Sequence, residues 1–205
     1  MTTIDLGDVS LEAHLRIPST ADRLAVFVHG SGSSRHSPRN NHVAERLEHD
    51  GVASLLFDLL TEAEDTSRAI RFDIDLLTRR VLDVLAWTRG QSELSDLALH
   101  LFGASTGAAA AIRAAAGSES HTIQSVVSRG GRPDLAGDAL GRLRAPCLLI
   151  VGGNDPQVLE MNRDAQAEMA CKNELRVVEG ATHLFQEPGA LDTVAEHASD
   201  WIRSH

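Results

Sequence analysis

Short apolar runs alternate along the chain with longer segments in which apolar residues recur every three or four positions. Unbroken runs of valine, leucine and isoleucine are typical of strands buried on both faces, as in a parallel sheet. The three-and-four spacing indicates amphipathic helices. We therefore expect strands at 24–30, 53–60, 97–103, 123–131, 146–153 and 175–180, and helices at 41–50, 73–89, 106–116, 158–170 and 190–204.

This order predicts an α/β fold: a doubly wound, mostly parallel sheet with helices on both faces. The opening segment, residues 4–18, is predicted to add one or two antiparallel edge strands. The sequence has no internal repeat, low-complexity tract or recognisable linker, and 205 residues suit one core. A single domain spanning 1–205 is the expectation.

Composition narrows the possible partners. The chain is 42% apolar with a formal net charge of −10, which argues against binding to nucleic acid or to an anionic membrane. No apolar run approaches the roughly 20 residues of a membrane span, and the acidic N-terminus has no signal-peptide core. Two cysteines, Cys147 and Cys171, have no metal-ligand spacing. A cytoplasmic protein is expected, and its oligomeric state is not predicted.

Polar residues gather where the predicted strands end, which is where ligands of open α/β sheets bind. Between a strand and a helix stands Gly-Ala-Ser-Thr-Gly, with Ser105 at its centre. This pattern fits G-x-S-x-G, a sharp turn that projects a serine hydroxyl above the sheet at a helix N-terminus. The alternative is a small-residue turn with a solvated serine. Ser105 is the candidate nucleophile.

A serine hydroxyl needs a base held by a third group. Asp155 follows the strand at 146–153, and His183 follows the strand at 175–180. We expect His183 to take the Ser105 proton and Asp155 to orient the imidazole. Each residue also has a purely structural interpretation: Asp155 could cap the helix that begins at the following proline, and His183 could be an ordinary loop residue. Asp134 and Asp138 are less well placed substitutes for Asp155.

An oxyanion hole needs two N–H donors. The N–H of Thr106, directly after the serine, is one expected donor. The other is the N–H of Ser31 in the segment His-Gly-Ser-Gly-Ser-Ser that starts at His29, with Gly32 as the second choice.

Other chemistries fit less well. The only lysine, Lys172, stands at the end of a predicted helix, and Cys147 lies at the wrong end of its strand. The ten histidines form no metal-binding motif, and no nucleotide-binding glycine motif or Walker lysine is present. No metal and no cofactor are expected.

Together these motifs resemble the α/β-hydrolase superfamily, and within it the small dienelactone-hydrolase-like branch. The resemblance runs from Leu24 to Trp201 and rests on HGSGSS, GASTG, GGND and GATHLF. It implies a Ser-Asp-His hydrolase of esters or related acyl bonds, and a structural role for Asp58. Dienelactone hydrolases proper have cysteine at the nucleophile position, so Ser105 argues against dienelactone itself as substrate. The run SRGGRPDLAG also resembles small bacterial hydrolases, some of them fused to a phosphoribosyltransferase domain, which is not recognised within these 205 residues.

The substrate is expected to be a small ester or lactone, because the segment after residue 131 is too short for a cap domain. Arg35, Arg129 and Arg132 also fall at strand ends, where they could hold an anionic substrate group. Of these, Arg35 and Arg129, with Gly32, are the candidate substrate contacts. Two other functions stay open: an acyltransferase or thioesterase with the same three residues, and a non-catalytic binding module on this fold.

Overall fold

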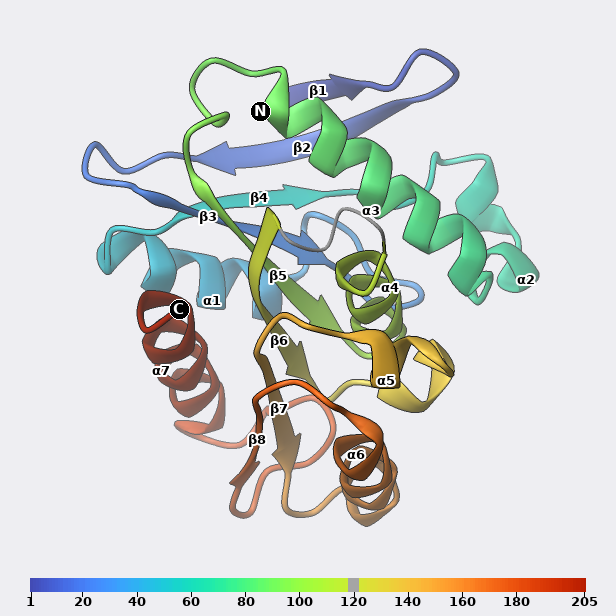
Figure 1. Cartoon of the computed structure of the whole chain (residues 1–205), viewed down its shortest axis with the longest axis vertical. Helices are drawn as coiled ribbons and strands as arrows, with labels where there is room; N and C mark the ends of the chain where they lie inside the picture. The colour runs from blue at the N-terminus through green and yellow to red at the C-terminus, as the bar shows by residue number, and fades with distance from the viewer. Residues whose placement is uncertain (118–121) are drawn as a thin grey trace.

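The computed structural model describes residues 1–117 and 122–205. Its described strands form one eight-stranded sheet in the order β1-β2-β4-β3-β5-β6-β7-β8 (Figure 1). The strands are β1 (Thr2–Asp5), β2 (Ser10–Arg16), β3 (Arg23–Val28), β4 (Ala53–Phe57), β5 (Ala98–Ala104), β6 (Ile123–Arg129), β7 (Cys147–Gly152) and β8 (Asn173–Val178). Strands β3 to β8 run parallel, whereas β1 and β2 pair antiparallel at one edge. The predicted mixed sheet is confirmed.

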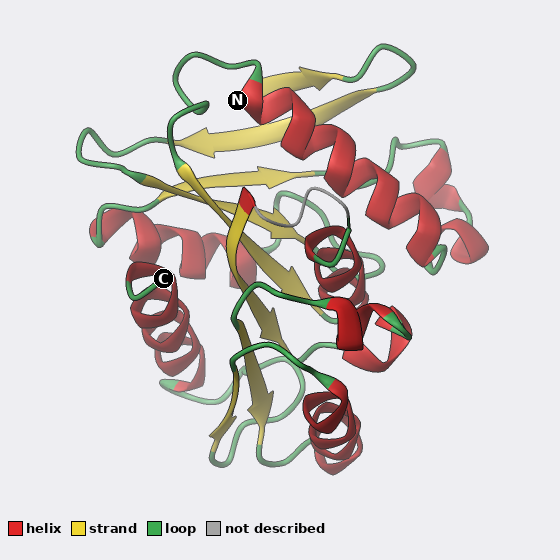
Figure 2. Cartoon of the chain, viewed as in Figure 1, coloured by secondary structure: helices red, strands yellow, loops and turns green. Residues whose placement is uncertain are grey.

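Helices cover both faces of this sheet, as predicted (Figure 2). The longer ones are α1 (Pro38–His49), α3 (Ile74–Arg89), α4 (Thr106–Ala115), α6 (Pro156–Glu168) and α7 (Ala190–Arg203). The short ones are η1 (Glu64–Thr66), α2 (Arg68–Arg71), η3 (Pro133–Ala136) and α5 (Ala139–Arg142). Among the described residues, no helix is both long and apolar enough to cross a membrane.

Two apolar clusters fill the two interfaces between sheet and helices. Helices α1 and α7 lie side by side on one face, where Leu47 and Val194 pack with Phe27 of β3. Helices α3 and α4 cover the other face, where Val84 and Ile112 join the second cluster. The alternating side chains of each buried strand therefore reach both clusters, which explains why the strands read as unbroken apolar runs.

The structure shortens the predicted strand at 53–60 to Ala53–Phe57. The chain turns there because Asp58 and Leu59 bond to other loops: the Asp58 carboxylate accepts the Arg35 N–H, and the Leu59 N–H donates to His29. The helix predicted at 41–50 begins earlier, at Pro38, because the Ser37 hydroxyl accepts the Asn40 N–H as an N-cap.

The segment between β6 and β7 contains only η3 and α5, so the fold has no cap domain. The ends of the parallel strands from β3 to β8 are left without a helical cover from this segment. The loops that follow β3, β5, β6, β7 and β8 carry the candidate residues of the predicted site.

Candidate active site

Ser105 occupies the turn between β5 and α4 with a backbone φ of 51° and ψ of −124°. A positive φ is rare for a residue with a side chain and costs roughly 1–3 kcal/mol, so the surrounding structure must enforce it. It does so through the main chain: the Ser105 N–H donates to the Arg129 carbonyl, and the Ser105 carbonyl accepts from the N–H groups of Ala108 and Arg132. The strained turn at this serine agrees with a nucleophile elbow.

The flanking glycines leave no room for side chains. A Cβ on Gly103 would lie 2.4 Å from the Cα of Ala108, and one on Gly107 would lie 2.1 Å from the carbonyl oxygen of Val28. Helix α4 therefore passes almost in contact with the backbone of β3 and β5. This close passage explains why the residues around Ser105 are so small.

His183 is bonded to Asp155. Its Nδ1 lies 2.7 Å from Oδ2 of Asp155, and because the carboxylate accepts, Nδ1 carries the hydrogen and Nε2 has the free lone pair. Asp155 is the N-cap residue of α6 but makes no side-chain capping bond. The carboxylate bonded to His183 is therefore that of Asp155, and not that of Asp134 or Asp138.

One cavity of about 140 Å³ is lined by four of the predicted residues, Ser31, Ser105, Arg129 and His183. Ser105 from the β5 turn and His183 from the loop after β8 both line it. Gly130 also borders it, and a Cβ there would lie 3.6 Å from the His183 ring. The remaining lining residues are Gly30, Ser33, Arg39, Ala104 and Leu184.

The loop after β3 lies against Ser105. A Cβ on Gly30 would be 2.9 Å from the Cβ of Ser105, so only glycine lets the loop come this close. The Ser31 N–H donates to the Thr106 hydroxyl at 2.9 Å. The two predicted oxyanion donors are thus neighbours beside the serine, and their role in binding an oxyanion stays a prediction.

His29 holds this loop in place, a role that the sequence analysis missed. The ring is 6% exposed; its Nε2 accepts the Leu59 N–H at 3.0 Å, so Nδ1 carries the hydrogen and donates to the Gly30 carbonyl at 2.9 Å. Burial lowers the pKa of His29, which keeps the ring neutral. The signal in the sequence was a histidine immediately before the glycine at a strand end.

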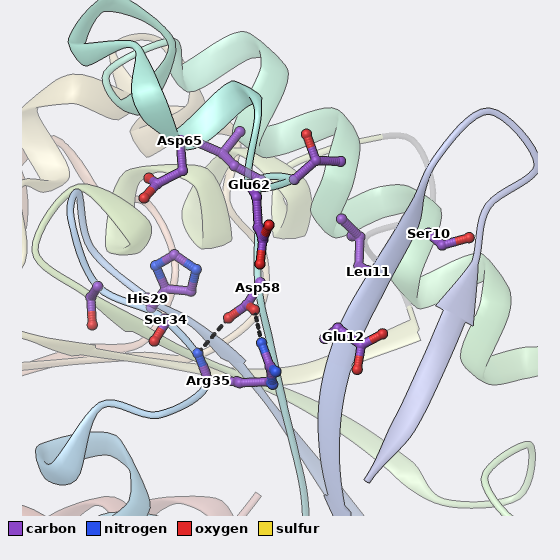
Figure 3. A pocket seen from close by; sticks show the side chains of 12 residues that line it. Ser10, Leu11, Glu12, His29, Ser34, Arg35, Asp58, Glu62 and Asp65 are labelled. Atoms are coloured by element: carbon purple, nitrogen blue, oxygen red, sulfur yellow. Dashed lines mark hydrogen bonds and ion pairs between the residues drawn. The ribbon is translucent and has the colours of Figure 1, made fainter.

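Arg35 and Gly32 do not line the Ser105 cavity. Arg35 borders a neighbouring pocket of about 320 Å³, where both its main-chain N–H and its guanidinium bond to the Asp58 carboxylate (Figure 3). This agrees with a structural role for Asp58. Gly32, with a φ of +70°, lies near the Arg71 side chain. Ser33 lines both pockets, so the two adjoin. Substrate contacts by Arg35 and Gly32 stay predictions.

The other arginines at strand ends differ from one another. Arg132 forms a two-bond ion pair with Asp134, at 2.9 and 2.7 Å. Arg129 lines the Ser105 cavity and is buried. Arg39, from the first turn of α1, also lines the cavity and was missed by the sequence analysis, because nothing in the sequence relates α1 to the serine turn.

Comparison with known proteins agrees with the fold. A family model described as "Alpha/beta hydrolase domain" matches residues 21–203. The chain is 54% identical over 199 residues to proteins of two Mycobacterium tuberculosis strains, CDC 1551 and H37Rv, each named "Putative phosphoribosyl transferase". The match covers 97% of this chain but 45% of each relative, so the chain spans less than half of their length.

Two solved structures share the fold. A dienelactone hydrolase from Anabaena variabilis is 47% identical, with a TM-score of 0.96 over 100% of this chain and 96% of that one. Est1E from Butyrivibrio proteoclasticus, solved with ferulic acid bound, is 18% identical, with a TM-score of 0.84 over 100% and 98%, and shows the shared fold alone. The family match and the dienelactone hydrolase confirm the resemblance seen in the sequence, and this chain belongs to the alpha/beta-hydrolase family.

Proposed function

We propose that the chain is a serine hydrolase that cleaves small carboxylic esters or lactones through an acyl–Ser105 intermediate. The observation that carries the proposal is that the strained Ser105 and the Asp155-bonded His183 line one cavity. A nucleophile, a base with a free ring nitrogen, and a carboxylate that orients this base are the groups that acyl transfer to water requires.

In the first half of the proposed reaction, Ser105 Oγ attacks the ester carbonyl carbon while His183 Nε2 takes the hydroxyl proton. The resulting oxyanion accepts hydrogen bonds from the main-chain N–H groups of Thr106 and Ser31. Since the Ser31 N–H donates to the Thr106 hydroxyl in this structure, it exchanges that acceptor for the oxyanion during turnover. His183 then gives its proton to the departing alcohol oxygen as the ester bond breaks.

In the second half, water attacks the acyl carbon and His183 takes a proton from it. Collapse of the second oxyanion breaks the bond to Ser105, whose Oγ recovers the proton from His183. Asp155 stays ionised throughout and stabilises the charged imidazole. Ester and water are converted to acid and alcohol, and the cycle consumes no other reactant.

The absence of a cap domain and the cavity volume of about 140 Å³ support short acyl groups. The name of the mycobacterial relatives does not oppose this, because it describes proteins of which the match covers 45%. The proposal concerns the matched part, whose family is that of hydrolases.

The test is labelling by a fluorophosphonate, which reacts with activated serines. We expect one adduct on Ser105, located by mass spectrometry, and no adduct in Ser105→Ala or His183→Ala. The wild type should hydrolyse para-nitrophenyl acetate and butyrate, and both variants should lose this activity. A folded protein that is not labelled would contradict the proposal, and equal turnover of short and long acyl esters would contradict the preference for short ones.

A further inference from the structure

A buried cation without a counter-ion lies beside the candidate nucleophile. Arg129 is 8% exposed, and its Nη1 is buried without a hydrogen-bond partner among the described residues. Within the described residues, none of the ion pairs involves Arg129, and the guanidinium lies 5.9 Å from the centre of the Phe102 ring. Burying an unpaired charge is strongly unfavourable, so such a group needs an explanation.

The electrostatic surroundings of Arg129 make its buried positive charge less favourable still. Burial, and to a lesser degree the nearby charge of Arg39, lower the pKa of Arg129 to about 10. Two arginines outside this cavity, one buried and one half-buried, do have carboxylate partners: Arg80 has Glu64, and Arg35 has Asp58. Even at a pKa of about 10 the guanidinium is charged at neutral pH, so an anion is the kind of group that would stabilise it.

Arg39 adds a second cation to the same cavity. It lies in the first turn of α1, a turn that has no acidic residue, and its Nε is buried without a partner in the described structure. A positive charge near a helix N-terminus is unfavourable because the helix dipole is positive there. Both arginines are therefore held where an anion would stabilise them, and both line the cavity with Ser105 and His183.

The backbone fixes Arg129 relative to the nucleophile. It is the last residue of β6, in register with Ala104 of β5, and its carbonyl accepts the Ser105 N–H at 3.2 Å. An anion bound by its guanidinium would therefore be held at a set position from Ser105 Oγ, as orientation of a substrate requires.

We propose that Arg129 and Arg39 form an anion subsite, and that the substrates are esters or lactones carrying a carboxylate or phosphate close to the scissile bond. This substrate class rests on the proposed hydrolase function. Arginine suits either anion because its planar guanidinium can donate two parallel hydrogen bonds to one oxyanion group.

Binding tests the subsite without catalysis. Using Ser105→Ala protein, calorimetry would measure the affinity for succinate, for inorganic phosphate and for neutral succinamide. We expect one of the two anions to bind, succinamide not to bind, and added Arg129→Met to weaken the anion at least about tenfold. The stronger anion identifies the group. Arg132→Gln is the matched control, because Arg132 is paired with Asp134 and does not line the cavity.

Stability separates a ligand role from a structural one. If the role of Arg129 is to bind an anion, Arg129→Met removes an unpaired buried charge and keeps an apolar contact with Phe102. The free energy of unfolding should then stay level or rise without ligand, and phosphate or succinate should raise it in the wild type only. A loss of stability in Arg129→Met, with no stabilisation of the wild type by either anion, would overturn the subsite.

Kinetics then tests the substrate class. The ratio of kcat/KM for para-nitrophenyl hemisuccinate to that for para-nitrophenyl butyrate should favour hemisuccinate if the group is a carboxylate, and should fall at least about tenfold in Arg129→Met and Arg39→Met. Suppose that butyrate hydrolysis depends on Ser105, that the ratio is unchanged in the variants and that no anion binds. These results would overturn the anion subsite and support the hydrolase function. Anion binding without any ester turnover would support the anion subsite and contradict the proposed hydrolase function.

Discussion

His183 Nδ1 and Asp155 Oδ2 are 2.7 Å apart although 28 positions separate the residues in sequence. The Asp155 side chain is largely buried, 16% exposed, whereas that of His183 is 42% exposed at the cavity. Asp155 makes no capping bond at the start of α6. The carboxylate is therefore available to orient the imidazole and stabilise its charged form.

Asp155→Asn should abolish most activity and leave the fold intact. The amide can bond Nδ1 in a different tautomer but cannot stabilise an imidazolium, so kcat should fall on the order of 10³- to 10⁴-fold. Because the side chain caps nothing, the melting temperature should change little. Short-ester kinetics and thermal unfolding measure the two. Full activity in the variant would show that the His183–Asp155 bond has no catalytic role.

Gly30→Ala should reduce kcat by displacing the loop after β3. The added Cβ would lie 2.9 Å from Ser105 Cβ and 3.1 Å from the Ala104 carbonyl, so the loop must move away from the serine and the Ser31 N–H with it. Loss of one oxyanion donor lowers kcat about 10²- to 10³-fold. Ser31→Ala keeps the main-chain N–H and should lower kcat by less than about tenfold. Equal losses in both variants would assign the role to the Ser31 hydroxyl instead.

The sequence predicted the sheet and the three residues at strand ends because both depend on local patterns. Unbroken apolar runs mark buried strands wherever they occur, and Ser105, Asp155 and His183 each follow such a run. The strand at 53–60 was predicted too long because its end depends on bonds to Arg35 and His29, which lie far away in the chain.

The arginines show where sequence patterns stop being informative. Arg35, Arg129 and Arg132 all lie near strand ends; Arg132 has a carboxylate, Asp134, two positions away, but no local feature separates Arg35 from Arg129. The structure pairs Arg35 with Asp58 and Arg132 with Asp134, and leaves Arg129 in the cavity without a carboxylate among the described ion pairs. The pairing of Arg35 with Asp58 spans 23 positions of the chain, so it depends on the tertiary fold and could not be predicted from the local sequence.

Gly107→Ala should destabilise the fold. The new Cβ would lie 2.1 Å from the Val28 carbonyl oxygen and 2.4 Å from that of His29, both backbone atoms that cannot move without shifting β3 from α4. A loss of at least about 2 kcal/mol in urea unfolding is expected. Gly141→Ala is the control: its Cβ would lie 3.8 Å from the nearest atom, the Glu168 carbonyl oxygen, so the variant should be as stable as the wild type or more so.

The buried His100 should make the protein less stable in mild acid. Its ring is fully buried in β5, where Nδ1 lies 2.8 Å from the Ser125 hydroxyl and Nε2 has no partner among the described residues. Burial, and to a lesser degree Arg23, lower the pKa of His100 from 6.5 to about 4. Above pH 6.5 the ring is neutral in both the folded and the unfolded state, and its full contribution to stability is present.

As the pH falls from 6.5 to about 4, the unfolded chain binds a proton at His100 and the folded one does not, so stability is lost over this window. The loss is about 3 kcal/mol for a shift of this size. His29, whose pKa burial also lowers, adds a loss of the same sign. Urea unfolding at several pH values should show that His100→Gln, which cannot titrate, has a shallower decline than the wild type over this range. Since every other titrating group is common to both proteins, parallel pH profiles would show that His100 is not what makes the fold acid-sensitive.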